Sequence, residues 1–146
     1  MVDDHPFILQ AYKNTLHGFK TDEYDIIIND ADSGKTGYEA IIKRGVVYDV
    51  AFLDISIPPY PEHSIDSGID LALLLREKMP HCKIVLLTMH TEKLKFKYIF
   101  DFIKPNGLVV KNDLTFEEFT LAFDKILNHE NYFSETVIKM IEEENN

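Results

Sequence analysis

Short apolar runs alternate with amphipathic segments along the whole chain. The apolar runs are rich in β-branched residues, are bounded by polar ones, and lie at residues 24–29, 49–53, 83–87 and 108–110. They lack the apolar–polar alternation of strands with one exposed face. We therefore expect strands that are buried on both faces, as in a parallel sheet.

Between these runs, apolar residues recur every three or four positions, which predicts helices. The predicted helices lie between Pro6 and Gly18, around 38–42, around 71–75, over 98–103 and from Thr115 to 126, and a short acidic helix follows Ser134. Strands that alternate with helices of this length form βαβ units with right-handed crossovers. Together with a strand expected at the start of the chain, the pattern predicts an α/β fold with a doubly wound, five-stranded parallel sheet.

The first strand of that sheet is expected to be short. Only Met1 and Val2 precede Asp3, where a strand should lead into the first helix. Such a strand is central in a doubly wound sheet, and a core does not easily survive its loss. Our hypothesis is that the chain starts part-way through this strand, and an intact mass equal to that of the sequence would count against it.

Length and charge narrow the class of protein. The chain has 146 residues, enough for one domain, with 15 Lys and Arg against 25 Asp and Glu and a net charge of −10. Because nucleic-acid binding needs clustered basic residues, we expect this domain to bind none. One cysteine, Cys82, suits a reducing compartment. No apolar run approaches the ~20 residues needed to cross a membrane, so we expect a cytoplasmic domain without a membrane contact.

Polar residues follow four of the expected strands directly. They are Asp3 and Asp4, Asp54, Thr88 and Lys111. In a parallel sheet these residues share one edge, where ligand sites form. Three carboxylates favour a hard dication such as Mg²⁺, and a lysine with a hydroxyl opposite them suits a phosphoryl group. Each residue alone is explained as well by helix capping or a helix N-terminus, but the ordered set is not.

At these residues the sequence resembles the receiver domain of bacterial two-component response regulators. The motifs are DDHP at 3–6, FLDISIP at 52–58, LLTMH at 86–90 and GLVVK at 107–111, and the first and third look most like the NarL/FixJ-type branch. The resemblance implies a (βα)5 flavodoxin-like receiver domain over residues 1–130. Residues 131–146 are then a C-terminal helix and linker toward an output domain outside this chain.

The resemblance also implies a role for each of these residues. Asp54 would be the phosphoacceptor, taking a phosphoryl group from a phosphohistidine of a sensor histidine kinase. Lys111 would pair with the phosphoryl oxygens, and Thr88 would hydrogen-bond to them after transfer. The implied Mg²⁺ site consists of Asp4, Asp54 and the backbone carbonyl of Ser56, with Asp3 acting through water.

In this interpretation the chain is a switch and not an enzyme, apart from its own phosphorylation and slow dephosphorylation. The resemblance implies a transcriptional, helix-turn-helix output domain as partner, and receivers commonly form homodimers through the face around their fourth and fifth helices.

The sequence departs from the family pattern in two further places. Leu108 stands where the family usually has an aromatic switch residue, which puts coupling to an aromatic rotamer in doubt. Nine residues, from Pro59 to Ser67, form a longer loop beside the acidic pocket. The insertion could shield the aspartyl phosphate or contact a partner, and a tolerated surface insertion is expected at least equally.

Two alternatives to a working receiver stay open. A degenerate receiver would act as a protein-interaction module only, an interpretation that Leu108 and the insertion allow. An Mg²⁺-dependent phosphohydrolase of haloacid-dehalogenase type would need a second aspartate two residues after Asp54, where Ser56 stands.

The segment SGKT at 33–36 lacks the earlier glycine of a phosphate-binding loop, because position 29 is Asn29.

Overall fold

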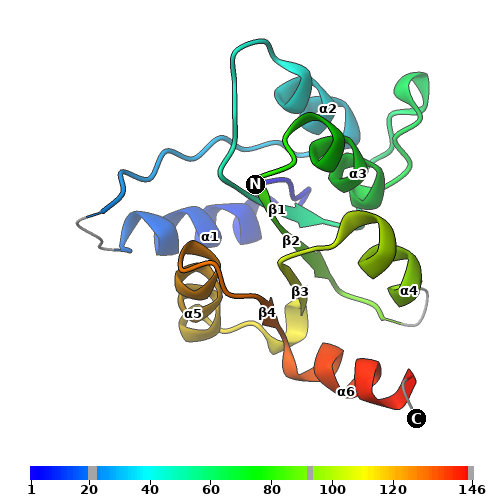
Figure 1. Ribbon diagram of the computed structural model, residues 1–146. Coiled ribbons are helices and arrows are strands. Elements are labelled where there is room, and N and C mark those ends of the chain that lie inside the picture. The colour runs from blue at the N-terminus through cyan, green and yellow to red at the C-terminus, as the bar shows by residue number, and fades with distance from the viewer. Residues whose placement is uncertain (20–22, 92–93, 145–146) are drawn as a thin grey trace.

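The structure is a computed structural model that describes residues 1–19, 23–91 and 94–144 (Figure 1). A parallel sheet of order β1-β2-β3-β4 forms its centre. The strands are β1 (Val50–Asp54), β2 (Lys83–Thr88), β3 (Gly107–Val110) and β4 (Tyr132–Phe133). The helices are α1 (Pro6–His17), α2 (Gly34–Ile42), α3 (Gly68–Lys78), α4 (Phe96–Tyr98), α5 (Phe116–Leu127) and α6 (Glu135–Glu144). Shorter turns are η1 (Pro61–His63), the π-helical η2 (Ile99–Ile103) and η3 (Lys111–Asp113).

Helices cover both faces of this sheet (Figure 1), which confirms the doubly wound α/β prediction. On one side α1 and α5 pack a cluster that includes Leu16, Phe119 and Phe123. On the other side α2, α3 and η2 pack a larger cluster, to which α6 contributes Val137. Among the described residues, no helix is long and apolar enough to cross a membrane.

The three predicted strands that become β1, β2 and β3 are confirmed, and both of their faces are buried. Within β2, Ile84 and Leu86 belong to one core cluster, whereas Val85 and Leu87 belong to the other. An apolar residue at every position is what a strand between two helical layers requires. The register pairs Leu86 with Leu108 and Asp54 with Leu87, so the carboxyl ends of these strands share one edge.

The predicted five-stranded sheet is wrong in one respect, because residues 24–29 form no regular strand in the described part of the chain. Val2 makes single parallel bridges to Ala31 and to Leu53, in the place of the expected first strand. The Met1 ammonium donates to the carbonyl of Asn29 at 2.9 Å. Among the described residues, the apolar run before Asn29 pairs with no strand of the sheet, and Ile27 is 87% exposed.

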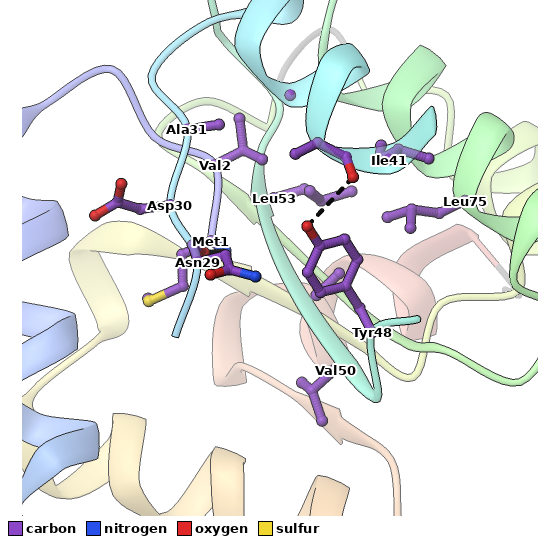
Figure 2. Close-up of a pocket in the computed structure, with 13 residues that line it drawn as sticks. Met1, Val2, Asn29, Asp30, Ala31, Ile41, Tyr48, Val50, Leu53 and Leu75 are labelled. Atoms are coloured by element: carbon purple, nitrogen blue, oxygen red, sulfur yellow. Dashed lines mark hydrogen bonds between the residues drawn. The ribbon is translucent and has the colours of Figure 1, made fainter. Parts of the chain in front are cut away.

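A small cavity marks the same place. It has a volume of about 40 Å³ and lies between residues 29–31, β1 and α2. Figure 2 shows Met1 and Asn29 on one side of it and Val50 on the other, with the Tyr48 hydroxyl donating to the carbonyl of Ala40 at 3.2 Å. The cavity thus lies beside β1, next to the bridges that Val2 makes.

The predicted helices are all present, and α5 matches its prediction closely. Thr115 is its N-cap and accepts a hydrogen bond from the Glu118 backbone N–H at 3.1 Å. Its buried residues are Phe119, Ala122, Phe123 and Ile126, the predicted apolar stripe. At the start of α2, Ser33 and Thr36 form a capping box, so the SGKT segment serves as a helix start.

The last strand, β4, was not predicted. Tyr132 and Phe133 pair in parallel with Gly107 and Leu108 of β3. The expected acidic helix after Ser134 is α6, and Val137 on it is fully buried. Residues 132–141 therefore pack against the sheet edge and the core cluster of α3 and η2.

Candidate functional site

The structure gathers the predicted polar residues at the carboxyl edge of the sheet. Asp54 is the last residue of β1, Thr88 is the last of β2, and Lys111 directly follows β3. All three are nearly inaccessible, with exposures of 1%, 3% and 8%. Asp3 follows the bridge at Val2 and is 2% exposed. Buried polar groups that lie this close together must form hydrogen bonds or ion pairs with one another.

Lys111 joins two of the carboxylates. Its Nζ lies 2.7 Å from Asp3 Oδ2 and 3.0 Å from Asp54 Oδ2. The ammonium and both carboxylates are almost completely buried, and removing one member of such a set would leave a buried charge unpaired. Lys111 therefore holds Asp3 and Asp54 together although they lie far apart in the sequence.

Opposing effects act on the pKa of the Asp54 carboxyl. Burial raises the pKa of Asp54 above its usual value, while the hydrogen bond and charge of Lys111 lower it and the charge of Asp3 raises it. The other carboxylate oxygen, Oδ1, accepts a hydrogen bond from the Ser56 backbone N–H at 3.2 Å. Behind Asp54, a Cβ on Gly68 would collide with the Asp54 carbonyl oxygen, so the loop from β1 to α3 can close only with glycine there.

Asp4 and His5 form the outer part of the site. Nδ1 of His5 lies 3.1 Å from Asp3 Oδ1, 3.1 Å from Asp4 Oδ1 and 4.0 Å from Asp54 Oδ2. The His5 ring is 54% exposed. The sequence predicted no role for His5, although this residue lies within the DDHP motif. Its position next to Asp4 and before Pro6 was the available signal.

Thr88 reaches the same edge, but its hydroxyl is engaged by the loop that follows β2. Oγ1 donates to the carbonyl of His90 at 2.7 Å and accepts from the His90 backbone N–H at 3.2 Å. Leu108 is fully buried in β3, between Leu86 of β2 and Phe133 of β4. The structure therefore brings Asp3, Asp54 and Lys111 into direct contact and places Thr88 beside them.

The donor set is suited to a hard divalent cation. Ligand atoms of Asp3, Asp4, His5 and Asp54 all lie within 4.8 Å of one another. Carboxylate oxygens are the ligands that Mg²⁺ prefers, and a dication would offset the repulsion between them. The residues present therefore fit Mg²⁺.

The insertion beside the site is folded onto α2. Tyr60 and Ile65 form an antiparallel bridge that closes the loop, and Ile65 is 4% exposed within the core. His63 stacks on Tyr38 of α2, with ring centroids 4.2 Å apart and planes 19° apart. Ser67 then caps α3 through a capping box with Asp70. The insertion is thus anchored at both of its ends.

Comparison with known proteins agrees with this geometry. The family model described as response regulator receiver domain matches residues 1–111. The transcriptional regulatory protein MctR of Rhizobium johnstonii is 29% identical over 139 residues, which cover 94% of this chain and 58% of MctR. This chain thus spans little more than half the length of that relative.

Two solved structures share the fold. A LuxR-family two-component response regulator from Aurantimonas sp. SI85-9A1 matches with a TM-score of 0.75 and 20% identity, covering 99% of this chain and 94% of that one. The isolated REC domain of RcsB from Salmonella enterica serovar Typhimurium, with the phosphomimetic BeF3⁻, also has a TM-score of 0.75 and 20% identity, covering 94% and 93%. The flavodoxin-like receiver fold is therefore confirmed.

Proposed function

Because this chain belongs to the response regulator receiver domain family, whose members are signalling switches, we propose that Asp54 accepts a phosphoryl group from a phosphohistidine of a sensor histidine kinase. One observation carries this proposal. Lys111 Nζ lies within 3.0 Å of Asp54 Oδ2 in a buried pocket that also holds Asp3. This arrangement supplies a nucleophilic oxygen and a fixed positive charge at the same point.

Each residue of the site has a separate role in the phosphoryl transfer. An oxygen of Asp54 bonds to phosphorus while the phosphorus–nitrogen bond of the donor histidine breaks. Lys111 neutralises charge on the phosphoryl oxygens, which is the main demand of this reaction. Mg²⁺, when bound, would neutralise the same oxygens. We propose that Asp4, Asp54 and the Ser56 backbone carbonyl hold it directly, and that Asp3 acts through water.

Thr88 is proposed to report that the transfer has occurred. Its hydroxyl holds the His90 backbone through two hydrogen bonds. A phosphoryl group on Asp54 would offer stronger, charged acceptors, and a hydroxyl that turned to them would release His90. The loop after β2 would then change conformation, and this is the kind of local charge event that biases a two-state surface.

The rest of the proposal concerns the larger protein. We propose that residues 1–130 are the receiver domain and that residues 131–146 lead toward a transcriptional output domain, in a cytoplasmic protein. A homodimer through the face of the fourth and fifth helices belongs to the same proposal. In this structure β4 and α6 lie along β3 at that face, so pairing there would involve them.

Uptake of a phosphoryl group from acetyl phosphate in the presence of Mg²⁺ tests the proposal. By intact mass, the wild-type chain should gain one phosphoryl group that is lost slowly by hydrolysis, and Asp54→Asn should gain none. Asp124→Asn, an exposed carboxylate on α5, is the matched control and should behave as wild type. The proposal fails if the wild type stays unmodified or if Asp54→Asn is modified equally.

The same experiment separates the alternatives. Sustained turnover of a small phosphoester would favour the phosphohydrolase. A chain that neither accepts the group nor binds Mg²⁺ would favour an interaction module.

A further inference from the structure

The histidine beside the acidic residues places a nitrogen atom within reach of all three carboxylates. Nδ1 of His5 is at hydrogen-bond distance, 3.1 Å, from both Asp3 Oδ1 and Asp4 Oδ1, and 4.0 Å from Asp54 Oδ2. The ring itself is half-exposed at 54%, whereas Asp3 and Asp54 are buried. The nitrogen therefore lies between the buried part of the pocket and solvent.

The local backbone fixes this orientation. His5 is the N-cap residue of α1, where a side chain ordinarily accepts a hydrogen bond from the first turn of the helix, but within the described residues its side chain makes no capping bond. Pro6 follows, and a residue before proline is held in extended conformations. His5 adopts one, with φ −100° and ψ 102°. Its backbone N–H also donates to Asp3 Oδ1 at 2.9 Å, which ties this turn to the pocket.

The spacings agree with ligand positions around one octahedral ion. With metal–ligand bonds of about 2.1 Å, neighbouring ligands of an octahedron lie ~3.0 Å apart and opposite ligands ~4.2 Å apart. Nδ1 of His5 lies near the first spacing from Asp4 Oδ1, at 3.1 Å, and near the second from Asp54 Oδ2, at 4.0 Å, and these are the two carboxylates proposed to bind the ion directly. A single ion can therefore contact His5 together with carboxylates of the pocket.

We propose that Nδ1 of His5 is a metal ligand and makes this pocket a mixed nitrogen–oxygen site, which binds first-row transition dications in preference to Mg²⁺. The inference rests on the proposed function, because it concerns the same metal site. Imidazole binds transition dications well, whereas carboxylates suit Mg²⁺. His5 thus determines which ion the pocket selects, while Asp4 and Asp54 supply the negative charge that any dication requires.

Cobalt(II) is the probe for this inference, because it shifts the proton resonances of a bound imidazole far from the diamagnetic range. The wild-type chain with Co²⁺ should show one shifted, solvent-exchangeable imidazole N–H resonance that is absent in His5→Ala. By calorimetry, His5→Ala should weaken Co²⁺ binding by about tenfold or more and Mg²⁺ binding by less than about threefold. Asp54→Asn should weaken both, which places the ions in this pocket.

Two further variants make the assignment specific. His5→Gln keeps a hydrogen-bonding side chain but no imidazole, so it should follow His5→Ala. His17→Ala removes an exposed histidine from the other end of α1 and should behave as wild type. Co²⁺ bound without the shifted resonance, or equal weakening of Co²⁺ and Mg²⁺ in His5→Ala, would overturn the inference while leaving the proposed function in place. Failure of the wild type to bind either ion would count against both.

Discussion

Replacing Val137 with alanine should destabilise the domain by about 2 kcal/mol, although this residue lies in the last helix of the chain. Val137 is fully buried and belongs to the same core cluster as Leu108, Val110 and Ile103. Deleting two buried methyl groups costs ~1.6 kcal/mol in transfer free energy, and the cavity left behind adds to it. The higher helix propensity of alanine returns about 0.5 kcal/mol in α6.

The neighbouring residue provides the matched control. Ile138 has a larger side chain on the same helix, but it is 45% exposed. Ile138→Ala gains the same helix propensity without opening a buried cavity, so we expect its cost to stay below about 1 kcal/mol. The comparison isolates burial from every effect of helix formation.

Urea unfolding followed by far-ultraviolet circular dichroism measures both variants, since the chain has no tryptophan for fluorescence. For a chain of this size, a loss of about 2 kcal/mol corresponds to a fall in Tm of roughly 4–8 °C. Equal costs for Val137→Ala and Ile138→Ala would refute the reasoning. In that case residues 131–146 would be a connecting segment that contributes nothing to the stability of the core.

Three further predictions concern residues elsewhere in the domain. Because burial raises the pKa of Asp54, the folded state holds this proton more tightly than the unfolded state, so the contribution of Asp54 to stability falls as pH rises above its ordinary value of 3.8. The stability of Asp54→Asn relative to wild type, measured by urea titrations, should therefore increase as the pH rises from 4.5 to 7. An equal difference in unfolding free energy between the two proteins at both pH values would contradict this. Gly68→Ala would push a methyl group into the Asp54 carbonyl, so we expect a loss of several kcal/mol in urea unfolding; near-wild-type stability would show that the loop can move aside. Arg76→Ala would remove the donors to the carbonyls of Ile103 and Cys82, at 2.8 and 2.7 Å, at a cost of about 2 kcal/mol in thermal unfolding that Arg76→Lys restores only in part.

The sequence predicted most of the residues at the carboxyl edge of the sheet, because strands that are buried on both faces appear as continuous apolar runs. The polar residue that ends such a run lies at the carboxyl edge of the sheet, so Asp54, Thr88 and Lys111 could be placed together without coordinates. The buried stripe of α5 was equally accessible from its helical spacing.

Which strands pair with one another was harder to predict from the sequence. The run at 24–29 has the composition of a strand, but a strand needs a neighbour for its backbone hydrogen bonds, and among the described residues the pairing next to this run is the single bridge of Val2 to Ala31. Conversely, Tyr132 and Phe133 form too short a run to stand out, and they become β4 because the free edge of β3 accepts them. Local sequence does not record which edges are free.

The sequence by itself thus determined the doubly wound class, the three main strands and the residues gathered at their ends, since burial and periodicity are properties of single segments. Only the tertiary structure decided the 2.7 Å contact of Lys111 with Asp3, the hold of Thr88 on the His90 backbone, and the approach of His5 to both Asp3 and Asp4 at 3.1 Å. Such contacts depend on the direction of each side chain, which is set by the packing of segments distant in the sequence and by the turn of His5 before Pro6.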